Sequence, residues 1–283
     1  MSTHPAANVR AVTRGDRSRL GSLLTRAAYK HFHLDWFSVY EILGEMPFFI
    51  METDDKPVAA LACPPDPPGV SWLRLFAVND GLDLSQSWTR LWMRAHDEAP
   101  RAGANTVVAL STHNWMHDLL RKSGFRQANE VLFMEWSEEQ ANLLGANELG
   151  IRTMHVRDLE QVERVDRTAF NPVWSLSLRS LKAAHSLASL ATVVEQDDQI
   201  IAYQISTASA LGAHLARLAV LPEFQGSGFG RALVQHVIRI HARRGLHRVS
   251  VNTQSDNLRS QDLYRSLGFK ATGQRYPLYQ IDL

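Results

Sequence analysis

The sequence has a single cysteine, Cys63, among its 283 residues. One thiol cannot form an internal disulfide or a zinc site with several thiolate ligands, so both kinds of cross-link are excluded. The chain also lacks an excess of charge, because 30 Lys and Arg face 29 Asp and Glu and leave a net charge of +1. Without a basic excess there is no electrostatic footprint for DNA or RNA, and we expect no nucleic-acid partner.

Long apolar runs are absent as well. The opening MSTHPAANVRAVTRGDRSR has no apolar core of a signal peptide, and no later run approaches the length of a membrane-spanning helix. We therefore expect no membrane partner and a cytoplasmic location. With 45% apolar and 21% charged residues the chain can bury a sizeable core, and its length suits two domains better than one.

The second half of the sequence repeats part of the first. At an offset of 144 positions, residues 118–126 (DLLRKSGFR) fall on residues 262–270 (DLYRSLGFK), with five of nine positions identical. Each stretch follows a β-branched run, and residues 74–78 (RLFAV) resemble residues 217–220 (RLAV) at nearly the same offset. Three matched stretches in one order indicate a duplicated domain, and we predict domains over residues 1–140 and 141–283.

The apolar pattern predicts alternating helices and strands. In the first half, Leu20, Leu23, Leu24, Ala27 and Ala28 form one helical stripe, and residues 48–51 and 58–61 fit a hairpin. In the second half, helices are expected over 159–169, 176–185, 231–244 and 257–266. Strands are expected over 191–195, 200–205, 214–221 and 248–253, with a final strand after Gly268. A mixed α/β sheet results.

A glycine-rich loop, residues 225–230 (QGSGFG), separates the strand at 214–221 from the helix that follows. The first turn of a helix has unpaired backbone N–H groups and a partial positive charge, and a loop without Cβ atoms lets phosphate oxygens approach these amides. We interpret the loop as a diphosphate cradle, with a tight turn that binds no ligand as the alternative. It has neither the Gly-Lys-Ser/Thr of a Walker A loop nor the G-x-G-x-x-G spacing of dinucleotide-binding folds.

The residues around this loop resemble the GNAT superfamily of acyl-CoA-dependent N-acyltransferases. The resemblance rests on motifs that follow the order and spacing of that family, namely 218–222 (LAVLP), 225–231 (QGSGFGR), Asn257, Tyr264 and 267–269 (LGF). It implies an α/β fold of two tandem GNAT-like domains, each a mixed, mostly antiparallel sheet flanked by helices. The first domain is then a divergent copy of the second.

The resemblance also implies where acetyl-CoA binds. The CoA diphosphate would be held by the backbone amides of Gln225, Gly226, Ser227, Gly228, Phe229, Gly230 and Arg231. The main chain of Leu218, Ala219 and Val220 would pair with the pantetheine arm as a strand does. Asn257 would reach that arm from the opposite side. No metal site is expected.

Acetyl transfer to an amine needs a base for the amine and an acid for the leaving thiolate. Tyr264 stands where the family has its acid, and a phenol stays protonated at pH 7; packing beneath the last strands is its alternative role. His214 stands where some members carry a catalytic Glu or His, and a neutral imidazole can accept a proton; a solvated surface position is its alternative. Members that acetylate ribosomal proteins have a Glu where this chain has Asn252, which cannot act as a base. Glu195 and Glu223 are reserve candidates.

The first half has lost these features. Its segment opposite the phosphate loop, residues 79–86 (NDGLDLSQ), has one glycine, and Asp80 and Asp83 would repel a diphosphate. Leu120 stands opposite Tyr264 and has no proton to give. We expect this half to lack catalysis, to bind CoA weakly or not at all, and to support the second domain.

These observations predict a GNAT-type N-acetyltransferase that moves an acetyl group from acetyl-CoA to a primary amine of a small molecule or a protein. The amine would attack directly, without a covalent enzyme intermediate. Two alternatives stay open, a non-catalytic acyl-CoA-binding sensor or scaffold and a tandem enzyme similar to mycothiol synthase. A homodimer is compatible with the sequence.

Overall fold

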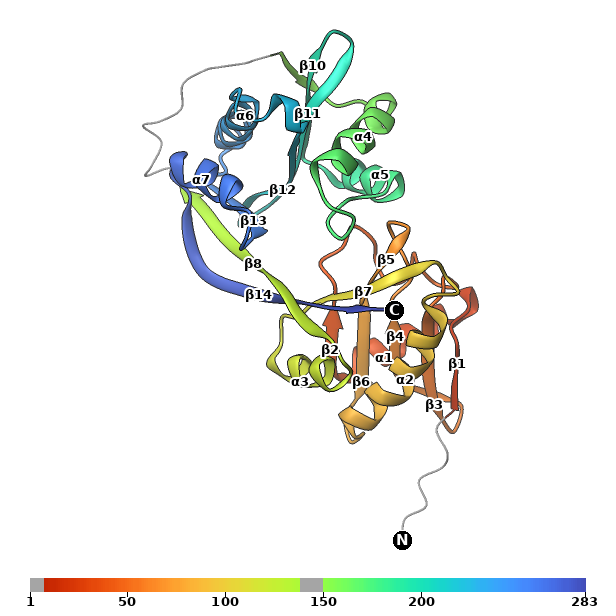
Figure 1. Cartoon of the computed structure of the whole chain (residues 1–283). Coiled ribbons are helices and arrows are strands. Elements are labelled where there is room, and N and C mark those ends of the chain that lie inside the picture. Colours follow the sequence, from red (N-terminus) through yellow and green to blue (C-terminus); the bar gives the residue numbers. More distant parts are fainter. Residues whose placement is uncertain (1–7, 138–149) are drawn as a thin grey trace. The chain divides into compact units, whose positions relative to one another are not determined.

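The computed structural model describes residues 8–137 and 150–283. Contacts divide the chain into two compact units that do not coincide with the sequence halves (Figure 1). The first unit consists of the residues up to Ala128 together with Pro277–Leu283, and the second of Asn129–Tyr276. The domain boundary expected at residue 140 falls outside the described residues and stays a prediction.

The first unit has two groups of hydrogen-bonded strands, in the orders β1-β3-β4-β6-β2 and β5-β7-β14. Helices α1 and α2 pack their apolar faces on the first group, which buries Leu20 and Leu23 of α1 and Trp88 and Leu91 of α2. The elements are β1 (Asn8–Ala11), α1 (Arg17–Arg26), β2 (Ala27–Phe32), β3 (Phe48–Thr53), β4 (Lys56–Ala62), β5 (Gly69–Trp72), β6 (Leu75–Asn79), α2 (Leu84–Glu98), β7 (Ala104–Leu110) and α3 (Asn114–Lys122).

The helix expected to continue through Ala28 ends earlier. Helix α1 ends at Arg26, and Ala27 begins strand β2, which pairs antiparallel with β6 from Ala27↔Asn79 to Phe32↔Leu75. The stripe was a poor guide here because β2 contains Tyr29 and Phe32, residue types that favour a pleated strand, and because the open edge of β6 needs hydrogen-bond partners.

The second unit has one sheet in the order β14-β8-β13-β12-β11-β10-β9. Only β12 and β13 run parallel there among the pairs described, so the sheet is mixed and mostly antiparallel, as predicted. The elements are β8 (Arg126–Ser137), β9 (Ile151–Thr153), α4 (Leu159–Ala169), α5 (Leu178–Leu187), β10 (Leu190–Gln196), β11 (Gln199–Ser209), β12 (Gly212–Val220), α6 (Phe229–Arg243), β13 (Arg248–Gln254), α7 (Leu258–Ser266) and β14 (Lys270–Asp282).

The last strand of each sequence half pairs in the sheet of the other half. Strand β8 follows α3 but pairs with β13, from Arg248↔Ser137 to Gln254↔Val131. Strand β14 follows α7, and its final residues pair with β7, from Leu278↔Leu110 to Asp282↔Thr106 (Figure 1). The first unit is therefore built from two separate stretches of sequence, whereas the second is one continuous stretch that includes most of β8 from the first sequence half.

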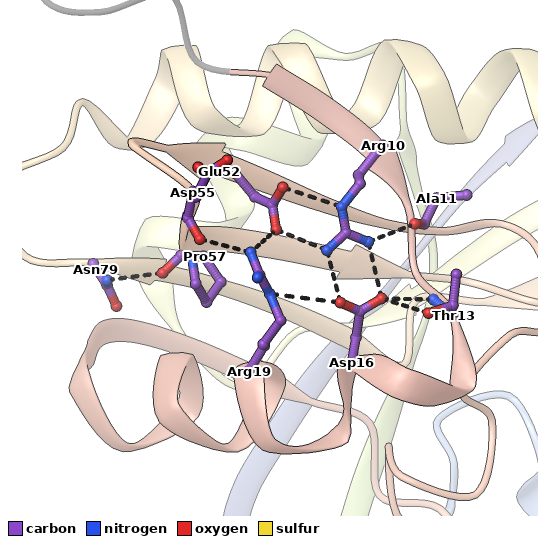
Figure 2. A network of polar contacts seen from close by, with 9 residues as sticks. All are labelled: Arg10, Ala11, Thr13, Asp16, Arg19, Glu52, Asp55, Pro57 and Asn79. Carbon is purple, nitrogen blue, oxygen red and sulfur yellow. Dashed lines mark hydrogen bonds and ion pairs between the residues drawn. The ribbon is translucent and has the colours of Figure 1, made fainter.

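An arginine-centred network occurs once in each unit and supports the duplication. Figure 2 shows the first copy, in which Arg10 donates from Nε to Glu52 at 3.0 Å and from Nη1 and Nη2 to Asp16 at 2.9 and 2.7 Å. In the second copy, Arg152 donates to Glu195 at 2.6 Å and to Asp158 at 2.7 and 3.1 Å. Each network ties a strand, β1 or β9, to the 3-10 turn before the following helix and to the strand paired with it in the sheet, β3 or β10.

Side-chain alternation fixes two faces on the second sheet. Ala213 and Leu215 of β12 and Val249 and Val251 of β13 are buried in one core with α6 and α7. Because successive strand residues point to opposite faces, His214 and Ser250 lie on the other face. No helix within residues 8–137 and 150–283 is long and apolar enough to cross a membrane.

Candidate active site

Strands β12 and β13 separate beyond a short paired region. Their parallel pairing covers Ala213↔Val249, His214↔Ser250 and Leu215↔Val251. On its other side, β12 stays paired with β11 as far as Val220, across a register irregularity. After Leu215 the edge of β12 toward β13 has no strand partner in the described chain, so backbone groups along this free edge can pair with an extended ligand.

The glycine-rich loop follows this free edge and opens α6. Gly226 and Gly228 have φ values of +87° and +90°, and Gly228 is the N-cap of α6 with no side-chain hydrogen bond. A Cβ on either glycine would meet no described atom within 4 Å, so the space beside the loop is open. Glycine is needed at these positions for the left-handed backbone conformation and not for lack of room. A helix N-terminus without a side-chain cap, beside open space at the two glycines, fits a diphosphate.

Two arginines add positive charge around the loop. Gln225 donates to the carbonyl of Val220 at 3.0 Å and accepts a hydrogen bond from Arg259, in the first turn of α7. Arg231, in the first turn of α6, donates to Ser266 at 2.7 Å. Both guanidinium groups are exposed. Arg259 was not among the residues expected from the sequence, although a basic residue two positions after Asn257 was a usable signal.

Asn257 is the N-cap of α7. Its Oδ1 accepts a hydrogen bond from the backbone N–H of Ser260 at 3.1 Å, and its Nδ2 donates to Gln254 at 3.4 Å. Capping accounts for the residue type, because Asn satisfies a backbone donor that the helix leaves unpaired. Its contact with a pantetheine arm stays a prediction.

Tyr264 lies on α7 within the core of the second unit. Its side chain is buried, and its ring contacts Phe269 with the centroids 5.5 Å apart. Burial raises the pKa of the phenol above its usual value of about 10. The hydroxyl therefore stays protonated at neutral pH and can donate a proton.

His214 is held in one orientation by Ser250. The Nδ1 atom of His214 lies 2.9 Å from Ser250 Oγ, and Ser250 Oγ donates to the carbonyl of Ala213 at 3.3 Å. In the tautomer with the proton on Nδ1, His214 donates to Ser250 Oγ and Nε2 keeps its lone pair. Burial lowers the pKa of the imidazole, so His214 is neutral at pH 7.

The structure places the two predicted catalytic side chains on opposite faces of the sheet. Tyr264 packs in the core with Leu215, whereas His214 points to the face away from that core. His214 belongs to the short paired region of β12 and β13, after which the pairing ends. The catalytic roles of the two side chains stay predictions.

A buried ion pair that was not expected from the sequence joins α4 to β12. Asp166 accepts hydrogen bonds from Arg217 at 2.7 and 2.8 Å, from the backbone of Leu176 at 2.6 Å, and from the hydroxyl of Tyr203. Arg217 also donates to the carbonyl of Trp174 at 2.6 Å. These bonds fasten the segment between α4 and α5 to the strand that carries His214. An arginine within an apolar strand was the available signal.

The remaining base candidates have structural surroundings. Glu195 is ion-paired with Arg152, which explains its residue type without catalysis. Glu223 lies in a short 3-10 helix before the glycine-rich loop. Asn252 lies on β13 two residues after Ser250 and so on the same face as His214. No group of three or more His, Cys, Asp or Glu that could hold a metal occurs among the residues described.

The corresponding region of the first unit is closed. Strand β2 pairs along β6, the strand that matches residues 218–220 of β12, so the chain itself covers the edge that is free in the second unit. Asp83 caps α2 by accepting a hydrogen bond from Gln86 N at 2.7 Å, which occupies a helix N-terminal donor. Leu120, opposite Tyr264, is fully buried.

The second unit thus combines a separating parallel strand pair with a glycine-rich loop and a helix N-terminus without a side-chain cap. Residues 156–269 match the model of the Acetyltransferase (GNAT) family. This part of the chain is therefore similar to the domains of that family. The whole chain has the fold of a tandem GNAT protein from the clavulanic acid biosynthesis pathway, with a TM-score of 0.65 at 13% identity and 98% of each chain covered.

Two relatives cover parts of the chain. The ribosomal protein bS18-alanine N-acetyltransferase of Escherichia coli K12 is 27% identical over 119 residues, which are 42% of this chain and 79% of the relative. Mycothiol acetyltransferase of Pseudarthrobacter chlorophenolicus is 46% identical over 52 residues, which are 18% of this chain and 16% of that protein.

Proposed function

We propose that the protein transfers an acetyl group from acetyl-CoA to a primary amine, with the chemistry in the second unit. The observation that carries this proposal is the free edge of β12, which runs directly into an uncapped, glycine-lined helix N-terminus. The edge suits the amide groups of a pantetheine arm, and the loop suits the diphosphate. The first unit lacks both features.

His214 and Tyr264 supply the two proton transfers of the reaction. Nε2 of His214 accepts the proton of the amine, directly or through a water, as the nitrogen–carbon bond forms. Tyr264 donates its hydroxyl proton to the sulfur as the carbon–sulfur bond breaks. Backbone N–H groups of β12 beyond Leu215 are available to the thioester oxygen, which becomes more negative in the transition state.

A direct attack by the amine agrees with the thiol content of the chain. A covalent route through the enzyme would require a nucleophile such as a thiolate. Cys63 is the only cysteine, it is fully buried in the first unit, and burial raises its pKa to about 12. It is therefore a neutral thiol at pH 7.

The acceptor is proposed as a primary amine of a small molecule or of a protein or peptide. The E. coli relative is named for alanine acetylation of a ribosomal protein, which favours testing a peptide N-terminus. This chain has Asn252 where we expect the Glu of such enzymes, so His214 takes the role of the base. The short match to a mycothiol acetyltransferase supports testing a cysteinyl aminosugar as a second acceptor.

The test follows the release of CoA thiol with a panel of amines, peptide N-termini and a cysteinyl aminosugar. We expect Tyr264→Phe to lower kcat by about 100-fold with little change in CoA affinity, since removing a general acid costs about 10²–10⁴ in rate. Tyr264→Phe keeps the ring that packs on Phe269, so it separates chemistry from packing. Unchanged turnover would remove Tyr264 from the acid role.

The same assay tests the base and the non-catalytic alternative. In kcat/KM, the acidic limb should have its midpoint below 6.5, because burial lowers the pKa of His214 and the imidazole must be unprotonated to act. His214→Ala should remove that limb. A protein that binds CoA but releases thiol with no acceptor in the panel would be a sensor or scaffold instead of an enzyme.

A further inference from the structure

The first unit contains a cavity that is separate from the proposed active site. It has a volume of about 350 Å³ and is lined by apolar and aromatic side chains together with His33, Asp35 and Arg74. A volume near this value is at the lower end of the range for small-molecule sites. Phe32 and His33, at the end of strand β2, form one wall.

The duplication explains why this space is open. Arg74 is the counterpart of Arg217 in the repeat, and Leu24 stands eight residues after Asp16 as Asp166 stands eight residues after Asp158. In the second unit, Asp166 holds the guanidinium of Arg217 and Phe170 packs against it, with 3.6 Å between guanidinium carbon and ring centroid. In the first unit, Leu24 replaces that carboxylate and lines the cavity.

The charges in the first unit differ accordingly. Arg74 is ion-paired with Asp35, and its Nη2 lies 3.7 Å from a carboxylate oxygen of Asp66. Two carboxylates therefore surround one guanidinium, which leaves this group with a net negative charge. A cationic ligand would restore neutrality, whereas a carboxylate ligand would meet an arginine that is already compensated.

His33 supplies a second polar feature. Its ring stacks on Trp72 with centroids 4.5 Å apart, and its Nδ1 is buried and has no hydrogen-bond partner within the described chain. Burial, assisted by the charge of Arg74, lowers the pKa of His33 to about 3, so the ring is neutral at pH 7. A neutral imidazole nitrogen can accept a hydrogen bond from a ligand and does not repel a cation.

We propose that this cavity binds a small organic molecule with a primary ammonium group and an apolar body. The ammonium group donates hydrogen bonds to Asp35 and His33. The apolar body lies against Leu24, Phe37 and Ile42, which line the cavity. The first unit thus keeps a ligand site at the place where the second unit has a sealed ion pair.

The experiment titrates the full chain, without CoA, with phenethylamine while following tryptophan fluorescence and heat. Trp72 is a reporter because it stacks on His33. The uncharged and anionic matched probes are 2-phenylethanol and phenylacetate. We expect saturable binding of the amine with a dissociation constant of about 1 mM or tighter, and at least tenfold weaker binding of the other two.

Variants locate the site. Leu24→Trp fills the cavity from a half-exposed position and should abolish the titration, and Asp35→Asn should weaken it at least tenfold. Asp80→Asn, at an exposed turn of the same unit, and His214→Ala, in the other unit, should leave it unchanged. Thermal unfolding checks that each variant is folded. If Asp35→Asn does not fold, the titration of Leu24→Trp is the test of the site.

The proposal is overturned if phenylacetate or 2-phenylethanol binds as tightly as phenethylamine. It is also overturned if the Leu24→Trp variant binds phenethylamine with the affinity of the unchanged protein. Loss of binding in His214→Ala would also overturn it, because the amine would then occupy the second unit. The titration needs neither CoA nor turnover, so a failure here is distinct from a failure of the proposed acetyltransferase function.

Discussion

The two units share a framework but differ at the edge of one strand. In the second unit the edge of β12 beyond Leu215 is free, whereas in the first unit β2 covers the matching edge of β6. Both units keep the arginine network and the strand, 3-10 turn and helix that surround it, β1 to α1 in the first unit and β9 to α4 in the second; the next element is strand β2 in the first unit and helix α5 in the second. A duplicated fold can therefore cover a strand edge with its own chain and still keep the arginine network.

The loop after that strand shows the same contrast. In the second unit a glycine with φ near +90° caps α6 and leaves its amides open, whereas in the first unit the Asp83 carboxylate caps α2. A side-chain cap stabilises a helix by about 1 kcal/mol but uses a donor that a phosphate would need. The second unit therefore lacks this stabilisation, and on the function proposed above its first helical amides bind the diphosphate instead.

The largest expected effect concerns the exchanged strands. A chain of residues 141–283 lacks β8 and with it Met134 and Trp136, which are buried in the core of the second unit. Losing two such side chains costs about 3–6 kcal/mol, a large part of the 5–15 kcal/mol that stabilises a domain. We expect this fragment to show no cooperative unfolding in urea, followed by near-ultraviolet circular dichroism.

The matched control begins at residue 126 and so restores β8. It should regain a cooperative transition, since β13 recovers its partner strand. If the fragment of residues 141–283 unfolds cooperatively by itself, the second sequence half folds without β8. The exchange of strands between the sequence halves would then not be needed for stability.

The next effect concerns the glycine cap. Gly228→Asp gives α6 the kind of cap that α2 has, and it places a carboxylate where the diphosphate is expected. We expect CoA affinity, measured by calorimetry, to fall by about 100-fold, because charge repulsion adds to the strain of a side chain at positive φ.

Gly228→Asn is the matched control, because it has nearly the same shape and no charge. It should lower CoA affinity by about tenfold or less, so the difference between the two variants isolates the charge. In the first unit, Asp83→Gly should create no second CoA site, since β2 still covers the edge of β6. Two CoA molecules bound per chain of that variant would contradict the role given to β2.

Much of the second unit could be predicted from its sequence. Helix α4 spans Leu159–Ala169 as expected, and the strand, glycine loop and helix around Gly228 follow the predicted order. These features are local, since side-chain periodicity and glycines with positive φ are visible in a short window of sequence.

The missed features depend on contacts between distant residues. Strand β2 pairs with β6, which lies more than forty residues further along the chain. Strand β14, near the C-terminus, pairs with β7 in the first half of the sequence. The Asp166–Arg217 pair joins a helix to a strand across 51 positions. No periodicity reports such partners, although the apolar surroundings of Arg217 and its repeat at Arg74 were hints.

The smallest expected effect tests whether the two arginine networks are equivalent. Hydrogen bonds from Arg10 and Arg152 lower the pKa values of Asp16 and Asp158 in the folded protein. A carboxyl group with a lowered folded-state pKa stabilises the fold above its unfolded value of about 3.9, and this stabilisation is lost as pH falls through the folded pKa. Each network should therefore contribute about 1–3 kcal/mol at pH 7 that disappears in acid.

Asp16→Asn and Asp158→Asn should each lower the free energy of unfolding at pH 7 and flatten its decline between about pH 5 and pH 2. The measurement is urea unfolding at several pH values, with Asp262→Asn as the control because that side chain is 75% exposed and its ion pair is on the surface. Similar losses in both variants would sharpen the comparison, since the frame would be equally strong in the two units. A loss of unfolding free energy in only one variant would show that the two networks have diverged. The unit with the free strand edge and the unit with the covered edge would then differ in how strongly their arginine networks stabilise them.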